Sequence, residues 1–110
     1  MAIPLSKTRR HGDTLYLSGE LGFAPDGTLP EGITAQTEQC LTNIEATLAK
    51  EGKSLADVIS CTCYLTDPAD FAAFNAVYSA RFPEPFPVRT TIGCALMIDA
   101  KVEITVIAKG

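Results

Sequence analysis

The last segment of the chain alternates strictly between apolar and polar side chains over the five positions 102–106. The stretch VEITVIA, residues 102–108, carries an apolar residue at 102, 104, 106 and 108. Side chains alternate faces along a β-strand, so this period of two predicts a strand with one face on a hydrophobic core. The apolar set is expected to face the helices, which leaves Glu103 and Thr105 on the other face of the sheet.

Two segments have the spacing and end signals of amphipathic helices. Residues 33–50 repeat apolar side chains every three or four positions, and Gly52 follows as a stop signal. The second helix is expected to begin at Asp67-Pro68, because Asp favours the N-cap and Pro the first helical position. Strands are expected around these helices, at 3–9, 13–19, 21–23, 57–66, 88–97 and 101–109.

This order of elements predicts an α+β domain, and the last two strands are expected to form an antiparallel hairpin because their connection is short. In the stretch PFPVRTTIGC, apolar residues alternate with Arg89 and Thr91. With a hairpin, parity predicts that Arg89 and Thr91 share the sheet face away from the helices with Glu103 and Thr105.

Two interpretations of that polar face remain open. In the first, the face is exposed to solvent, and Arg89 and Glu103 are solvated or form a weak cross-strand ion pair. In the second, a neighbouring subunit closes the face into a cleft, where Arg89 grips a ligand carboxylate and Glu103 acts as a general acid or base. Because Ile107 and Met97 are expected on the same face, we favour a buried surface between subunits.

Composition limits the other functions. The length of 110 residues fits a single domain over 1–110, and the longest apolar runs are far shorter than the ~20 residues of a membrane span. The net charge of −4 disfavours nucleic acid as a partner. No secretory signal is recognisable, which predicts a cytoplasmic protein with reduced cysteines. Cys61-x-Cys63 lacks the second ligand pair of a zinc site, so no metal is expected.

The run Pro87-Val88-Arg89-Thr90 with the later Val102-Glu103-Ile104 resembles the signature of the reactive-intermediate deaminase family, RidA/YjgF. Leu17-Ser18-Gly19-Glu20 is similar to the Ser-Gly motif of that family's first hairpin. Further residues fall in matching order along the chain: Asn43, Asp57, Asp70-Phe71 and Asn75-x-x-Tyr78.

The resemblance implies a chorismate-mutase-like fold, a mixed sheet with two helices on one face, and a homotrimer with ligand clefts between subunits. It implies hydrolysis of 2-imino or 2-enamino acids to 2-keto acids and ammonia, without a cofactor. Arg89 would bind the substrate carboxylate, Glu103 would position or activate water, and Ser18 and Gly19 would line the pocket. Independently of the resemblance, Thr91 is a further candidate catalytic residue whose hydroxyl would hold a water molecule, and the alternative is an ordinary strand threonine.

The chain also departs from the family pattern. Leu5 stands where the better-studied branch has a tyrosine, and Thr91 stands where that branch has a cysteine. Three alternatives follow. The protein is a trimeric carboxylate-binding regulator without catalysis, or a pathway deaminase for a 2-aminomuconate-like compound. The third, RNA cleavage as reported for some relatives, is disfavoured by the acidic balance.

Overall fold

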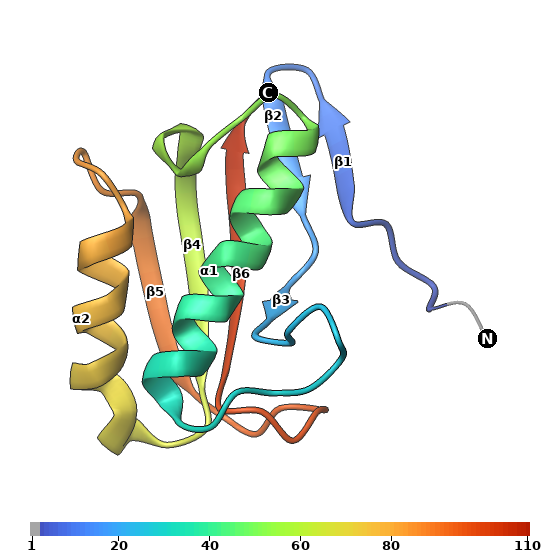
Figure 1. Cartoon of the computed structure of the whole chain (residues 1–110). Coiled ribbons are helices and arrows are strands. Elements are labelled where there is room, and N and C mark those ends of the chain that lie inside the picture. Colours follow the sequence, from blue (N-terminus) through green and yellow to red (C-terminus); the bar gives the residue numbers. More distant parts are fainter. Residues whose placement is uncertain (1–2) are drawn as a thin grey trace.

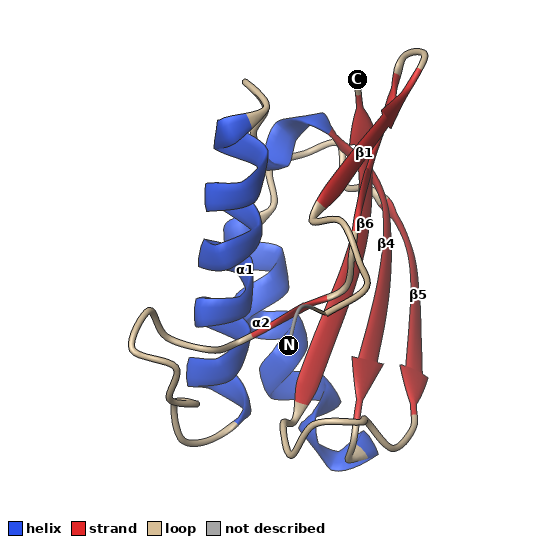
Figure 2. Ribbon diagram, turned by 90° about the vertical axis from the view of Figure 1, so that its right-hand side faces the viewer, coloured by secondary structure: helices blue, strands red, loops and turns tan. Residues whose placement is uncertain are grey.

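In the computed structural model, which describes residues 3–110, two helices cover one face of a twisted sheet and leave its other face open (Figures 1 and 2). This arrangement confirms the predicted α+β class with both helices on one face. The helices are α1 (Ile33–Lys50) and α2 (Phe71–Arg81), and the short 3-10 turns Leu55–Asp57 and Pro68–Asp70 precede β4 and α2. The strands are β1 (Thr8–His11), β2 (Thr14–Leu17), β3 (Glu20–Leu21), β4 (Val58–Leu65), β5 (Val88–Gly93) and β6 (Val102–Lys109).

Strand β6 lies inside the sheet, where it pairs with β2, β3 and β4 and so connects the two halves of the sheet. The order is β1-β2-β6-β4-β5, and β3 also pairs with β6. Its predicted inward row is confirmed, because the apolar residues at 102, 104, 106 and 108 are all buried against the helices. The intervening Glu103 and Thr105 are only partly buried. The alternation in the sequence therefore identified the core-facing side of this strand correctly.

The first helix occupies the predicted residues, 33–50, and buries the predicted stripe that includes Leu41, Ile44 and Leu48. The second begins three residues later than predicted, because Pro68–Asp70 form a 3-10 turn first. Asp67 caps that turn, its side chain accepting a hydrogen bond from the backbone N–H of Ala69 at 2.9 Å. Neither of the described helices is long and apolar enough to cross a membrane.

The predicted hairpin of the last two strands is wrong. Strand β5 pairs with β4 in parallel, and β4 separates it from β6. Parallel neighbours need a crossover connection, and α2 supplies it in a β4-α2-β5 unit. The chain then leaves β5 at Gly93 and passes over the end of β4, where Leu65 accepts a hydrogen bond from the N–H of Cys94. Strand β5 is therefore an edge strand and ends earlier than the predicted 97.

Arg81, near the end of α2, connects the two helices. Its guanidinium donates to the Glu38 carboxylate at 2.6 Å, to the Glu38 backbone oxygen at 3.1 Å and to Thr42 Oγ1 at 3.2 Å. It also pairs with Glu45. Hydrogen bonds to both carboxylates raise the pKa of Arg81 from its ordinary value, although burial opposes them. One planar cation thus bonds three residues spaced along one face of α1.

We predict that Arg81→Gln lowers the free energy of unfolding by about 1 kcal/mol, because it removes a network of charged contacts rather than a single surface pair. The measurement is urea unfolding followed by circular dichroism. Arg10→Gln is the matched control, since Arg10 makes one exposed contact to Glu51 at 3.5 Å. Equal losses in the two variants would contradict the proposed role of the network.

Candidate functional site

The structure corrects the predicted face of Arg89. Along the parallel pair of strands, Arg89 stands beside Cys61 and Thr91 beside Cys63, and both cysteines are buried under the helices. Arg89 and Thr91 therefore lie on the helix side of β5. Glu103 stands beside Tyr64 on the open side. The predicted set of four polar residues on one face is thus divided between the two faces of the sheet.

The physical reason is that the open face is itself apolar at this edge. Val88 and Ile92 point to the open side and are 68% and 43% exposed. Arg89, by contrast, covers aromatic rings of α2 with its flat guanidinium, which lies 4.7 Å from the ring centre of Tyr78 and 5.7 Å from that of Phe71. The predicted alternation along β5 is present, but its apolar half lies on the open side of the sheet and its polar half on the helix side.

Arg89 retains donors for a ligand. Its Nη1 donates a hydrogen bond of 2.7 Å to Asn75 Oδ1, from the facing side of α2. Within residues 3–110, no carboxylate lies at ion-pair distance from this guanidinium, and the side chain is exposed. A guanidinium presents five donors in a fixed fork. Asn75 fixes one edge of the Arg89 guanidinium, and the positive charge of this group has no carboxylate partner within the described residues.

Two cavities lie between α2 and β5. The first, called here the arginine cavity, has a volume of about 360 Å³ and is lined by Asn75, Tyr78, Ser79, Phe86, Pro87 and Arg89. The second, called here the threonine cavity, has about 200 Å³ and is lined by Leu65, Pro68, Phe71, Thr91, Ile92 and Gly93. The oxygen of the Thr91 hydroxyl is buried, and no hydrogen-bond partner is found for it within residues 3–110.

Beneath Arg89 the groups are buried and uncharged. Burial raises the pKa of the Cys61 thiol to about 11 and that of the Cys63 thiol to about 12. Burial likewise raises the pKa of the Tyr78 hydroxyl from its ordinary value. Because only a thiolate is a good nucleophile, these two protonated thiols are unreactive at neutral pH and act as buried core residues. Tyr78 is 5% exposed and belongs to the core, and the face of its ring supports the guanidinium.

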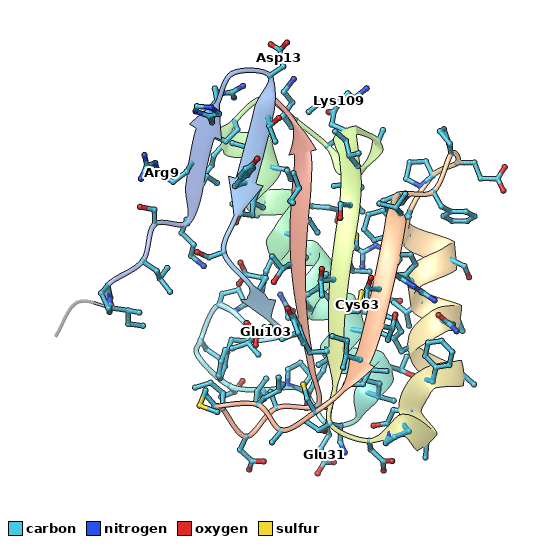
Figure 3. All side chains as sticks on the ribbon, turned by 180° about the vertical axis from the view of Figure 1, so that it is seen from behind. Arg9, Asp13, Glu31, Cys63, Glu103 and Lys109 are labelled. Atoms are coloured by element: carbon cyan, nitrogen blue, oxygen red, sulfur yellow. The ribbon has the colours of Figure 1, made fainter. Side chains whose placement is uncertain are left out.

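Glu103 lies on the open side of β6, against the loop between β2 and β3 (Figure 3). A Cβ atom on Gly19 would stand 2.2 Å from Glu103 Oε2 and 3.2 Å from Thr105 Oγ1. Gly19 is therefore needed so that the backbone can approach the carboxylate. Glu103 also lines a cavity of about 270 Å³ with Tyr64, Cys94, Ala95, Leu96, Met97 and Thr105.

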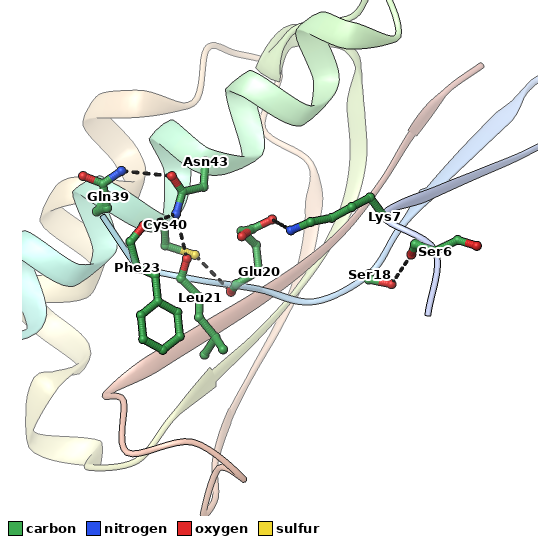
Figure 4. Close-up of polar contacts among 9 residues, drawn as sticks. All are labelled: Ser6, Lys7, Ser18, Glu20, Leu21, Phe23, Gln39, Cys40 and Asn43. Carbon is green, nitrogen blue, oxygen red and sulfur yellow. Dashed lines mark hydrogen bonds and ion pairs between the residues drawn. The ribbon is translucent and has the colours of Figure 1, made fainter. Parts of the chain in front are cut away.

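The loop that carries Gly19 is held by hydrogen bonds on both sides (Figure 4). Ser18 Oγ donates to the backbone oxygen of Ser6 at 2.6 Å, so this hydroxyl fixes the N-terminal segment. Asn43, on α1, donates to the backbone oxygens of Leu21 and Phe23. Two segments distant in sequence thus hold the loop next to Glu103.

Among the residues predicted for the site, the structure brings Gly19 and Glu103 together and, separately, Arg89 and Thr91. Within residues 3–110 there is no group of three or more His, Cys, Asp or Glu side chains placed to hold a metal ion. The sequence indicated Asn75 only as a match to the family's order of residues, whereas in the structure its Oδ1 accepts a hydrogen bond from Arg89. Asn75 and Arg89 stand 14 residues apart and meet only because α2 packs on β5, so no local signal in the sequence indicated this contact.

Comparison with known proteins agrees with this architecture. The family model described as Endoribonuclease L-PSP matches residues 1–109. The chloroplastic Reactive Intermediate Deaminase A of Arabidopsis thaliana is 37% identical over 108 residues, which cover 96% of this chain and 58% of that protein. The 2-iminobutanoate/2-iminopropanoate deaminase of Dermatophagoides farinae is 34% identical, covering 92% of this chain and 82% of that protein. The crystal structure of RidA from an Antarctic Psychrobacter superposes with a TM-score of 0.93 at 40% identity, covering 99% of this chain and 90% of that one.

A mixed sheet with two helices on one face, matched over nearly its whole length, places the chain in a class of small α+β proteins that includes deaminases. The chain belongs to the endoribonuclease L-PSP family, also called the YjgF/RidA family. The names of its relatives support deaminase activity at the level of the family. The Arabidopsis relative is named as a chloroplast protein, so the cytoplasmic location of this chain stays a prediction.

We predict different effects for alanine at two glycines. A Cβ on Gly22 would stand 2.4 Å from the backbone oxygen of Gln36 in α1, which cannot move alone, whereas Glu103 can rotate away from a Cβ on Gly19. Gly22→Ala should lower the free energy of unfolding by about 2 kcal/mol or more, and Gly19→Ala by less than about 1 kcal/mol. Urea unfolding measures both, and a larger loss for Gly19→Ala would contradict this account.

Proposed function

We propose that the protein hydrolyses 2-imino or 2-enamino acids to 2-keto acids and ammonia, at sites built between copies of the chain in a homotrimer. The observation that carries the proposal is the exposed guanidinium of Arg89, which is oriented by Asn75 and lacks a carboxylate partner within residues 3–110. A fork of this kind binds a carboxylate through two parallel hydrogen bonds. The deaminase names of the relatives support the same reaction.

The division of the polar residues supports a site shared between copies. Arg89 and Thr91 lie on the helix side of edge strand β5, and Glu103 lies on the open side of β6, with β4 between the two strands. The open face carries exposed Tyr16 and Val88, which a neighbour would cover. A second copy whose β5 edge packs over this face would bring its Arg89 to the Glu103 of its neighbour.

The reaction then needs few groups. Arg89 holds the carboxylate, and water attacks the imine carbon while Glu103 accepts one of its protons. The protonated Glu103 returns that proton to nitrogen, which gives a carbinolamine. Glu103 then transfers the hydroxyl proton of the carbinolamine to the nitrogen as the carbon–nitrogen bond breaks, so the keto group forms and ammonia leaves. The Thr91 hydroxyl, buried without a partner in the described chain, holds the attacking water. Gly19, next to the carboxylate of Glu103, and Ser18, which fixes the loop, line the glutamate side of the site.

The test is the decay of imino acids generated by an amino-acid oxidase, with survivors trapped by semicarbazide. We expect Arg89→Ala to lower kcat/KM by about 10²-fold, because the substrate carboxylate loses a charged partner. Arg10→Ala is the matched control, an arginine at the other edge of the sheet that contacts only Glu51 among the side chains described. Wild-type protein no faster than Arg89→Ala on every imine would refute the proposal.

A site shared between copies predicts complementation. Arg89→Ala and Glu103→Gln should each be inactive alone but regain activity when the two chains are refolded together. In a random trimer about a quarter of the interfaces combine an intact Arg89 with an intact Glu103, so about a quarter of wild-type activity is expected. No recovery, with mixed oligomers verified by mass spectrometry, would place both residues of a site on one chain.

Binding without turnover is the second candidate function. It is favoured by the same geometry, because Arg89 with its aromatic support is complete on one chain, whereas Glu103 is not part of that group. Calorimetry with a 2-keto acid separates the two. Arg89-dependent binding with no loss of any imine would identify a carboxylate-binding protein.

A further inference from the structure

The arginine cavity, defined above, offers more room than a carboxylate needs. We infer that it receives the substrate's side chain and that the protein selects 2-imino acids with large apolar side chains. The inference rests on the proposed function, because it assumes that Arg89 holds the substrate carboxylate. It concerns a part of the surface to which the proposed reaction assigns no role, beyond the contribution of Arg89 itself.

The cavity has an apolar wall and a polar rim. Phe86 and Pro87, in the loop before β5, and Tyr78, on α2, supply the apolar lining. Asn75 and Ser79, one helical turn apart on α2, add the polar groups. Arg89 is the only charged residue among those that line it. A volume of about 360 Å³ lies within the usual range for small-molecule pockets.

The arginine cavity extends from Arg89 in the direction that we expect the substrate's side chain to take. An imino acid carries a carboxylate, a nitrogen and a side chain on or next to the carbon that water attacks. Pro87 lies before Arg89 in the chain, and Thr91, which would hold the water, lies after it along β5. The two cavities therefore extend in opposite directions from the guanidinium. With the carboxylate on Arg89 and the water near Thr91, the side chain extends into the arginine cavity.

The lining also decides which side chains fit. A second carboxylate would find no further cation there, and the aromatic and proline walls cannot solvate it. A methyl group would leave most of the volume to water. Isobutyl and benzyl groups would contact Phe86 and Tyr78 and remove apolar surface from water. The favoured class is therefore the imines of leucine-like and phenylalanine-like amino acids.

The experiment compares Ser79→Phe with Ala80→Phe. Both add the same ring to neighbouring positions of α2, but Ser79 lines the arginine cavity, whereas Ala80 is exposed outside it. The measured quantity is the ratio of kcat/KM for the phenylalanine imine to that for the alanine imine. Wild type should show a ratio of about ten or more, which Ser79→Phe should lower at least about tenfold and Ala80→Phe should leave unchanged. Circular dichroism checks the fold of each variant.

The outcomes separate the two proposals. Turnover that depends on Arg89 but favours the alanine imine, or a ratio that Ser79→Phe does not lower, overturns the inference and leaves the proposed function standing. If no imine is turned over, calorimetry with phenylpyruvate and pyruvate decides the inference on its own. Tighter binding of phenylpyruvate that both Arg89→Ala and Ser79→Phe weaken supports it, and any other pattern overturns it.

Discussion

The burial of one row of side chains on β6 and β4 against α1 and α2 is the interaction on which the rest of the structure depends. The row on β6 is fully apolar, and Cys61 and Cys63 continue it on β4. Because side chains on a strand alternate, burying this row commits Glu103 to the open face. It also leaves the helix side of edge strand β5 to be covered by α2 alone, which is where Arg89 lies.

Different contacts position the two halves of the proposed site, Glu103 on one side of the sheet and Arg89 on the other. Gly19 allows the loop between β2 and β3 to pass directly beside the Glu103 carboxylate, and Asn43 holds that loop from α1. On the other half, aromatic rings of α2 support the Arg89 guanidinium, and Asn75 fixes one edge of it. The Arg89 guanidinium is thus held by rigid side chains, whereas for Glu103 it is the neighbouring loop that is held in place.

Membership of the YjgF/RidA family and the placement of Arg89 are two independent observations that support the proposed function. The family gives the deaminase class through the names of its relatives. The structure adds that the acidic and basic halves lie on opposite sides of one sheet, so a chain by itself does not bring them together. Thr91 and the arginine cavity are features of this chain from which substrate selection can be argued.

The sequence by itself determined the local structure: the helix at 33–50 and the inward row of β6. These follow from periodicity and capping, which act within one segment. Only the tertiary structure decided the neighbour of β5 and therefore the face of Arg89. Alternation along a strand separates its residues into two faces, but it does not show which face meets the helices when a neighbouring subunit could cover the other. Here α2 forms a parallel crossover, and the apolar half of β5 is left on the open side.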